Sequence, residues 1–174
     1  TDTPMKRGHI IRDEDPATPK QRSFVDSFPY SEIVGGLLYL SVVTRVDISY
    51  AVGVLTRHMK CPTYEACLAV CRVLNYLSKT KSKGIRYSGV SLNMVGYTDS
   101  DWASDNDTRR STSGYVLMMA GGPVSWMSKL QPIVATSSME AEYISCYFLV
   151  QEITWVRAFL ASVPQALLSD NSLH

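Results

Sequence analysis

Apolar positions recur at helix spacing in the first part of the chain and in short strand-like runs in the second. From Tyr30 onward the apolar residues fall on one helix face, and Ser31 is the expected N-cap. A second amphipathic stretch covers residues 47–59 and begins with an acid that suits a helix N-terminus. A third begins at Pro62 and Thr63. Its expected apolar stripe is Tyr64, Cys67, Leu68, Cys71, Leu74 and Leu77.

Residues 1–29 lack such a period. They are polar and hold four of the eight prolines of the chain: Pro4, Pro16, Pro19 and Pro29. Proline fixes φ and removes a backbone donor, so a segment rich in proline and without apolar periodicity is typical of a linker. We therefore expect an extended arm or linker over residues 1–29.

The second part opens with three short apolar runs, at residues 94–97, 115–119 and 124–127. Their length and the turn residues between them predict three strands. The first run leads directly into two carboxylates, Asp99 and Asp101. Acids at the end of a strand are a common way to place metal ligands, although most such acids are turn residues.

A helix should follow the strands. Ser137 and Glu140 form a capping-box pattern, and apolar positions continue to about Ala161. A last run at residues 166–169 predicts another strand, which ends in Asp170. This predicted order of three strands, a helix and a further strand indicates an α/β (α+β) fold in which a mixed sheet packs against a helix.

Composition and charge limit the possible partners. Hydrophobic residues make up 45% of the 174 residues and charged residues 19%, which is typical of a globular protein. The net charge of +1 shows no strongly basic field, so a polyanion would have to bind a local cluster. One cluster ends the third helix: Lys79, Lys81, Lys83 and Arg86. Such cations usually complement the helix dipole, and phosphate contact is the alternative.

The four cysteines indicate a reducing compartment. Cys61, Cys67, Cys71 and Cys146 stand in apolar contexts without the spacing of a disulfide framework. A zinc site that adds His58 is disfavoured, because the spacing matches no standard zinc motif and buried thiols explain Cys67 and Cys71.

The sequence predicts a soluble intracellular protein without a membrane partner. The longest apolar run, residues 33–43, contains glycine and serine and is shorter than the ~20 residues that span a bilayer. The N-terminal residues do not have the pattern of a signal peptide.

The carboxylates suit metal-dependent phosphodiester hydrolysis. That chemistry needs several acids around two hard cations about 4 Å apart. Asp99 follows a predicted strand, Glu142 lies near the start of a predicted helix, and Asp170 follows a further predicted strand. Acids in these positions can meet at one edge of a sheet. Asp101 faces the same side as Asp99, and spacing does not separate the two. Glu140 is explained by the capping box, which leaves Glu142 as the better ligand.

Several further side chains are candidates for contact with nucleic acid. Arg109, Arg110 and Lys129 can bind phosphate, and Trp102 and Trp126 can stack on bases, although core packing is the preferred interpretation of both tryptophans. A phosphatase or small-molecule hydrolase would need a Cys or Ser nucleophile motif, and the sequence shows none.

Longer segments of the chain resemble the C-terminal part of the polyprotein of copia-type LTR retrotransposons, in which the end of the reverse transcriptase precedes ribonuclease H. In the first part these segments are residues 30–40 (YSEIVGGLLYL), 44–48 (TRVDI) and 72–77 (RVLNYL). In the second part they are residues 97–103 (YTDSDWA), 109–115 (RRSTSGY), 125–126 (SW), 129–132 (KLQP), 137–143 (SSMEAEY) and 170–171 (DN).

The resemblance implies that residues 30–90 are the helical tail of a reverse transcriptase and residues 91–174 a ribonuclease H-like domain truncated at its C-terminus. Asp99, Glu142 and Asp170 then match the first three catalytic acids, which bind two Mg²⁺ or Mn²⁺ ions. The implied reaction is attack of water on the RNA strand of an RNA–DNA hybrid. It would take place within the polyprotein, in cytoplasmic virus-like particles or in the nucleus.

The chain also departs from the family pattern. The fourth acid would lie beyond His174 and the polymerase aspartates before Thr1, so we expect no polymerisation. Val46, Ala66 and Cys67 stand where the family usually has proline, histidine and tryptophan. We therefore expect ribonuclease H activity to be weak or absent in this chain alone. The alternative is a decayed, non-catalytic remnant or a nucleic-acid-binding module.

Overall fold

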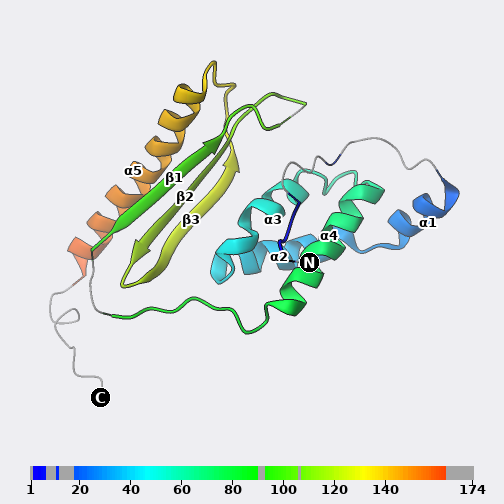
Figure 1. The fold of residues 1–174 in the computed structure, drawn as a ribbon, viewed down its shortest axis with the longest axis horizontal. Coiled ribbons are helices and arrows are strands. Elements are labelled where there is room, and N and C mark those ends of the chain that lie inside the picture. Colours follow the sequence, from blue (N-terminus) through cyan, green and yellow to red (C-terminus); the bar gives the residue numbers. More distant parts are fainter. Residues whose placement is uncertain (1, 7–10, 12–17, 90–92, 106, 164–174) are drawn as a thin grey trace. The chain divides into compact units, whose positions relative to one another are not determined.

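The computed structural model describes residues 2–6, 11, 18–89, 93–105 and 107–163. The chain divides into two compact units, residues 1–86 and 87–174 (Figure 1). The first unit is helical, and the second combines an antiparallel sheet with one long helix.

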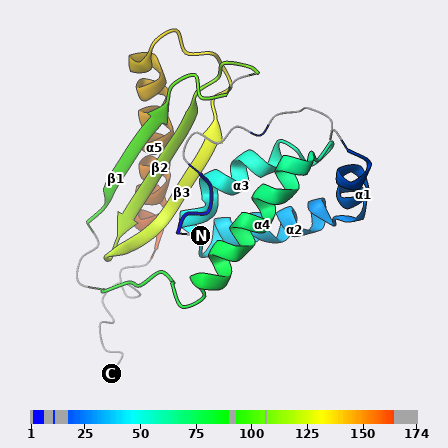
Figure 2. The same ribbon diagram turned by 45° about the vertical axis from the view of Figure 1, so that its right-hand side comes forward.

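The first unit contains α1 (Pro19–Ser27), α2 (Tyr30–Val43), the 3-10 turn η1 (Val46–Ile48), α3 (Ser49–Thr56) and α4 (Tyr64–Lys79). Figure 2 shows α2, α3 and α4 lying against one another. Their apolar faces meet in a core from which water is excluded. Its fully buried members include Val34, Ile48, Val52, Leu55, Val70 and Val73.

Helix α1 lies inside the predicted arm, and the prediction of an extended segment is wrong for these residues. The side chain of Thr18 accepts a hydrogen bond from the backbone N–H of Gln21, and Gln21 Oε1 accepts one from the N–H of Thr18 at 3.1 Å. Pro19 occupies the first position of the helix, where its missing N–H costs nothing and its fixed φ is already helical. A proline that suggested a linker therefore starts a helix.

The three following helices form where the apolar periodicity predicted them, but two begin differently. Pro29 rather than Ser31 holds the N-cap position of α2, and Ser31 Oγ instead donates to the carbonyl of Met59 at 3.4 Å. Asp47 belongs to η1, and α3 begins two residues later at Ser49.

The buried face of α4 also differs from the predicted stripe. Ala66, Val70 and Val73 are fully buried, whereas Leu68 and Leu74 are 47% and 40% exposed. Apolar residues lie on more than one side of this helix. Spacing alone therefore could not select the side that faces the core.

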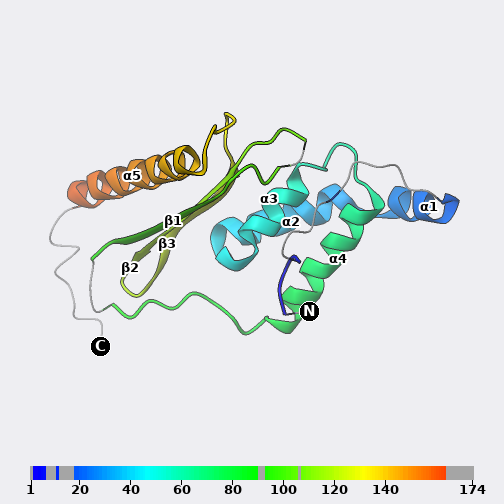
Figure 3. The same cartoon turned by 45° about the horizontal axis from the view of Figure 1, so that its top comes forward.

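The second unit is a three-stranded antiparallel sheet in the order β1 (Val95–Asp101), β2 (Thr112–Met119) and β3 (Gly122–Leu130). Figure 3 shows α5 (Ser138–Ser162) running along one face of this sheet. Its core is small and is built around three buried side chains, Leu117, Leu149 and Val156. This confirms the predicted mixture of helix and sheet, and the strands are longer than the apolar runs that indicated them.

The final predicted strand, residues 166–169, lies outside the described residues. None of the helices described is long and apolar enough to cross a membrane.

Candidate active site

The alternation of side chains along β1 decides where Asp99 points. Gly96 and Thr98 face α5: a Cβ added to Gly96 would lie 2.8 Å from Leu149, and Thr98 Oγ1 lies 2.7 Å from Ser145 Oγ. Successive strand residues point to opposite faces. The exposed side chain of Asp99 therefore points to the sheet face that α5 leaves uncovered.

The buried hydroxyl of Ser145 fixes the backbone at Asp99. Ser145 Oγ lies 2.7 Å from the carbonyl oxygen of Asp99 and 3.2 Å from that of Gly114 on the neighbouring strand. Thr98 Oγ1 lies 3.2 Å from the same Gly114 carbonyl. Two strands and one helix thus share a small polar network, which holds α5 against β1 next to the first candidate acid.

Glu142 lies one helical turn before Ser145 and level with Asp99. Helix α5 runs antiparallel to β1, because Leu149 lies against Gly96 while Ser145 lies against Thr98. Four residues of a helix rise about 6 Å along its axis, and two residues of a strand rise about 6.7 Å. Every four residues of α5 therefore correspond to about two residues of β1. The two carboxylates therefore occupy the same end of the sheet, one on the strand and one on the helix.

A cation that binds both acids would have to sit at the outer edge of β1, since Asp99 points away from the helix that carries Glu142. Among the described strands, β1 pairs with β2 alone, so its other edge is open there. The sequence placed the third acid, Asp170, at the end of a neighbouring strand, and this residue lies outside the described residues. Within the described part of the chain, no group of three or more His, Cys, Asp or Glu side chains is arranged to hold a metal ion.

Glu140 and Glu142, near the start of α5, have different surroundings. Ser137 Oγ accepts a hydrogen bond from the N–H of Glu140 at 3.1 Å, which confirms the N-cap of the predicted capping box, whereas the Glu140 carboxylate reaches Thr136 in place of the Ser137 N–H. The Glu140 carboxylate accepts from both N and Oγ1 of Thr136, at 2.6 and 2.7 Å, and these bonds lower the pKa of Glu140. Glu142 is exposed and has no hydrogen-bond or ion-pair partner among the described residues. Of these two glutamates, Glu142 is therefore the one whose carboxylate has no partner among the described residues and can bind a ligand.

Gln131 connects the end of β3 to the start of α5, a role that the sequence did not reveal. Its side chain is fully buried, and Nε2 donates to Ser113 Oγ at 2.8 Å and to the carbonyl of Ala141 at 2.9 Å. Its N–H donates to the carbonyl of Ser111 at 2.8 Å. Because the residue next to Ala141 is Glu142, this amide fixes the helix turn that carries the second candidate acid.

The candidate phosphate contacts lie on the same unit. Arg109 and Arg110 precede β2, and Lys129 lies near the end of β3; Arg109 and Lys129 are exposed and Arg110 is half-buried. The preferred interpretation of Trp102 as a core residue is wrong, because Trp102 is 51% exposed while its Nε1 donates to the carbonyl of Ala135 at 3.3 Å. Trp126 is half-buried in β3.

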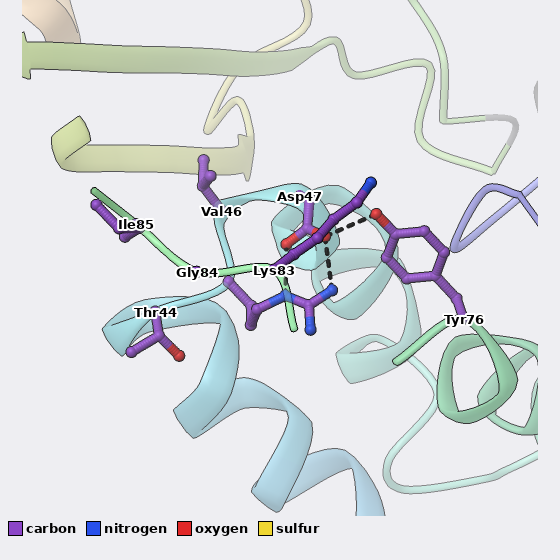
Figure 4. Close-up of a pocket in the computed structure, with 8 residues that line it drawn as sticks. Thr44, Val46, Asp47, Tyr76, Lys83, Gly84 and Ile85 are labelled. Atoms are coloured by element: carbon purple, nitrogen blue, oxygen red, sulfur yellow. Dashed lines mark hydrogen bonds and ion pairs between the residues drawn. The ribbon is translucent and has the colours of Figure 1, made fainter. Parts of the chain in front are cut away.

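A second polar cluster, also missed from the sequence, lies in the first unit (Figure 4). The guanidinium of Arg45 donates to both oxygens of Asp47, at 2.9 and 2.7 Å, and to Thr80 Oγ1 at 2.6 Å. Tyr76 OH donates to Asp47 Oδ2 at 2.7 Å. The hydrogen bond from Arg45 lowers the pKa of Asp47, and the bond to Asp47 raises the pKa of Tyr76. The cluster is internally neutralised, which indicates a structural role.

Two plant relatives are similar to most of the chain. The retrovirus-related Pol polyprotein from transposon TNT 1-94 of Nicotiana tabacum is 41% identical over 145 residues, which are 83% of this chain and 11% of the relative. The corresponding polyprotein from transposon RE1 of Arabidopsis thaliana is 40% identical over 153 residues, 84% of this chain and 10% of the relative. The chain thus spans about a tenth of the length of these polyproteins.

A third relative, secreted RxLR effector protein 161 of Plasmopara viticola, is 46% identical over 131 residues, which are 74% of this chain and 91% of the relative. No family model matches the chain, and no solved structure matches it. The 145 residues shared with the tobacco polyprotein are more than either structural unit contains, so the similarity extends over both. The chain belongs to the family of Pol polyproteins of copia-type retrotransposons.

Proposed function

We propose that the second unit is the ribonuclease H part of a retrotransposon Pol polyprotein and hydrolyses the RNA strand of RNA–DNA hybrids. Its metal-binding acids are Asp99, Glu142 and Asp170. The observation that carries the proposal is the fixed position of Asp99 next to α5, at the level of an unpaired Glu142. The name of the plant relatives, retrovirus-related Pol polyprotein, supports a nuclease that serves reverse transcription.

The two acids within the described residues fit a hard divalent cation. Both are exposed, and neither forms a hydrogen bond or ion pair through its carboxylate with another described residue. No donor in the described part of the chain therefore competes for the carboxylate oxygens, which are the ligands that Mg²⁺ and Mn²⁺ prefer. Two such ions, when bound, supply an activated water and neutralise charge at the scissile phosphate.

The other residues of the unit would position these acids and the substrate. Ser145 holds the backbone of Asp99, and Gln131 holds the turn before Glu142, so both carboxylates stand on rigid elements. Arg109, Arg110 and Lys129 would contact the phosphates of the hybrid. The 2′-hydroxyl and the duplex shape would distinguish RNA from DNA.

Cleavage of a labelled RNA–DNA hybrid with Mg²⁺ or Mn²⁺ tests the proposal. We expect the 174-residue chain at high concentration to cut the RNA strand slowly, and the Asp99→Asn variant and EDTA to abolish the cutting. Asp107→Asn, which changes an exposed loop acid, is the matched control and should cut normally. Equal cutting by the chain and its Asp99→Asn variant, or none by either, would reject catalysis by this chain through Asp99.

The second candidate function is binding without catalysis. It is favoured by the relative that is named as an effector. A segment of this chain corresponds to 91% of that relative, so a similar sequence also occurs in a protein that is not named as a polyprotein. Retained affinity for the hybrid without any cleavage would support this candidate.

A further inference from the structure

Four basic side chains of the first unit follow one another closely along the chain, and none has an acidic partner among the described residues. Lys79 ends α4, and Lys81, Lys83 and Arg86 follow along the chain; all four are exposed. None of the four side chains forms an ion pair or hydrogen bond with another described residue. We call residues 79–86 the basic segment.

The basic segment concentrates charge that the whole chain lacks. Residues 57–86 hold seven Lys or Arg residues against a single acid, Glu65, while the complete chain has a net charge of +1. Arg45 also lies close to the segment, but its charge is compensated. It is 9% exposed, and its guanidinium donates hydrogen bonds to both carboxylate oxygens of Asp47. The positive potential here therefore comes from the exposed side chains of the segment.

A purely structural explanation accounts for only one of these cations. The favourable effect of a cation on the helix dipole falls off within the last turn. Lys79 is in that turn, but Thr80 is already the C-cap, so Lys81, Lys83 and Arg86 lie beyond the helix. Within the described part of the first unit, the charges of Lys81, Lys83 and Arg86 take part in no ion pair.

The segment also borders a recess. Lys83, Gly84 and Ile85 line a cleft of about 200 Å³ whose other wall is formed by residues 44–47, with Tyr76 also lining it (Figure 4). Inside the cleft Arg45 and Asp47 neutralise each other, so Lys83 carries the uncompensated charge of its lining. The recess is therefore open to an anionic group.

We propose that the basic segment binds the phosphate backbone of a nucleic-acid duplex, with Lys83 and the adjoining cleft receiving one phosphate. Closely spaced unpaired cations provide the sequence-independent attraction of such a surface. A membrane fits less well, because Ile85 is the only apolar residue between Ser78 and Arg86 and interfacial binding requires an apolar face. The surface lies in the first unit, and its binding does not depend on cleavage by the acids of the second.

The test compares two triple variants of the full chain with the same change in charge. The first is Lys81→Gln, Lys83→Gln and Arg86→Gln. The control is Lys6→Gln, Lys20→Gln and Lys60→Gln, three exposed lysines outside the segment. Binding of a fluorescent RNA–DNA hybrid and of a DNA duplex is titrated in EDTA, which suppresses metal-dependent hydrolysis. Failure of the nuclease proposal thus leaves this measurement unaffected.

We expect the first variant to bind both duplexes at least tenfold more weakly at about 50 mM salt, and its slope of log affinity against log salt to fall by about 2–3 relative to the unchanged chain. The control should bind within about twofold of the unchanged chain. A single Lys83→Glu variant, with its fold checked by circular dichroism, should show a smaller loss in the same direction.

Two outcomes would overturn the proposal. One is equal weakening by the two triple variants, or weakening by neither, which would show that the position of these charges has no importance. The other is loss of binding to phosphatidylserine vesicles by the first variant while its duplex affinity is unchanged, which would assign the segment to an anionic membrane.

Discussion

The hydroxyl of Ser145 on α5 lies 2.7 Å from the hydroxyl of Thr98 on β1, and this contact fixes the helix to the strand directly beside Asp99. Ser145 is fully buried, so each polar atom there needs a partner inside the protein. The carbonyls of Asp99 and Gly114 complete the network. A helix rotated or shifted by one residue would leave these groups unpaired, so the network selects one placement of α5.

Replacing Ser145 with alanine should therefore destabilise the second unit. The variant leaves the Thr98 hydroxyl and the Asp99 carbonyl with fewer partners in a buried site, and we expect the free energy of unfolding to fall by about 1–3 kcal/mol. Urea unfolding monitored by circular dichroism measures this free energy of unfolding. Thr154→Ala is the control, since Thr154 is exposed on the same helix and, among the described residues, its hydroxyl bonds to the carbonyl of Val150 alone. This variant should change stability by less than about 0.5 kcal/mol. Equal losses would contradict the role of the network.

The close contact between Gly96 and α5 gives a second prediction. A Cβ at Gly96 would lie 2.8 Å from both methyl carbons of Leu149, which is 7% exposed and has little room to move. We expect Gly96→Ala to lower the free energy of unfolding by about 1–3 kcal/mol, the usual cost of overpacking. In Gly114→Ala the new Cβ meets only a carbonyl at 3.6 Å, so this variant should be tolerated. Thermal unfolding of both variants measures this difference in stability.

Local signals in the sequence predicted the elements that depend on neighbouring residues. The N-cap at Ser137 and the long extent of α5 follow from side chains within one helix, and both are confirmed. Thr18 and Gln21 carry an equally local signal, a capping box around Pro19, but the surrounding prolines concealed it. A capping pattern is therefore a better guide to a helix start than proline content.

Contacts between distant residues could not be predicted in this way. Gln131 reaches Ser113 and Ala141, and Arg45 reaches Thr80, over separations at which no period in the sequence gives information. The candidate acids illustrate the same limit: their order along the chain suggested one site, while the pleat of β1, which turns Asp99 away from α5, became visible only from the contact of Thr98 with the helix.

The ion pair between Arg45 and Asp47 should make the first unit sensitive to acid. The side chain of Arg45 is 10% exposed, so Asp47→Asn leaves a nearly buried cation without its anion. We expect a loss of about 2–3 kcal/mol at neutral pH, below the range for fully buried pairs because Asp47 is 31% exposed. Asp107→Asn, in an exposed loop, should have no comparable effect.

The pH dependence of this loss has a definite sign. Arg45 lowers the pKa of Asp47 below its ordinary 3.8, so the unfolded chain takes up the proton first. The stabilisation is complete above about pH 4 and is lost as the pH falls through the folded pKa. The difference in urea stability between the chain and Asp47→Asn should therefore shrink below pH 3.8. A difference that stays constant down to about pH 2 would exclude the ion pair as its source.

Cys67 should be the least reactive of the described thiols. It is fully buried, and desolvation, followed by the nearby Cys71, raises its pKa to about 11. The thiolate is the reactive form, so at about pH 8 a disulfide reagent should modify the exposed Cys61 and Cys146 rapidly and Cys67 only after unfolding in urea. Mass spectrometry of the labelled peptides distinguishes them. Rapid labelling of Cys67 in the folded chain would show that its side of α4 is open to solvent.

Substitution of each of the two glutamates near the start of α5 should have a different effect, one on stability and the other on catalysis. Glu140 is bound by Thr136, and its pKa is lowered by that bond, so Glu140→Gln should lower the melting temperature while hybrid cleavage continues. Glu142 has no such partner among the described residues, so Glu142→Gln should keep the melting temperature and lose the Mg²⁺-dependent cleavage. Both variants remove one negative charge from the same helical turn, and each thus serves as the control for the other. Cleavage that survives in Glu142→Gln and disappears in Glu140→Gln would transfer the ligand role to Glu140, whose bond to Thr136 would then have to open when the metal binds.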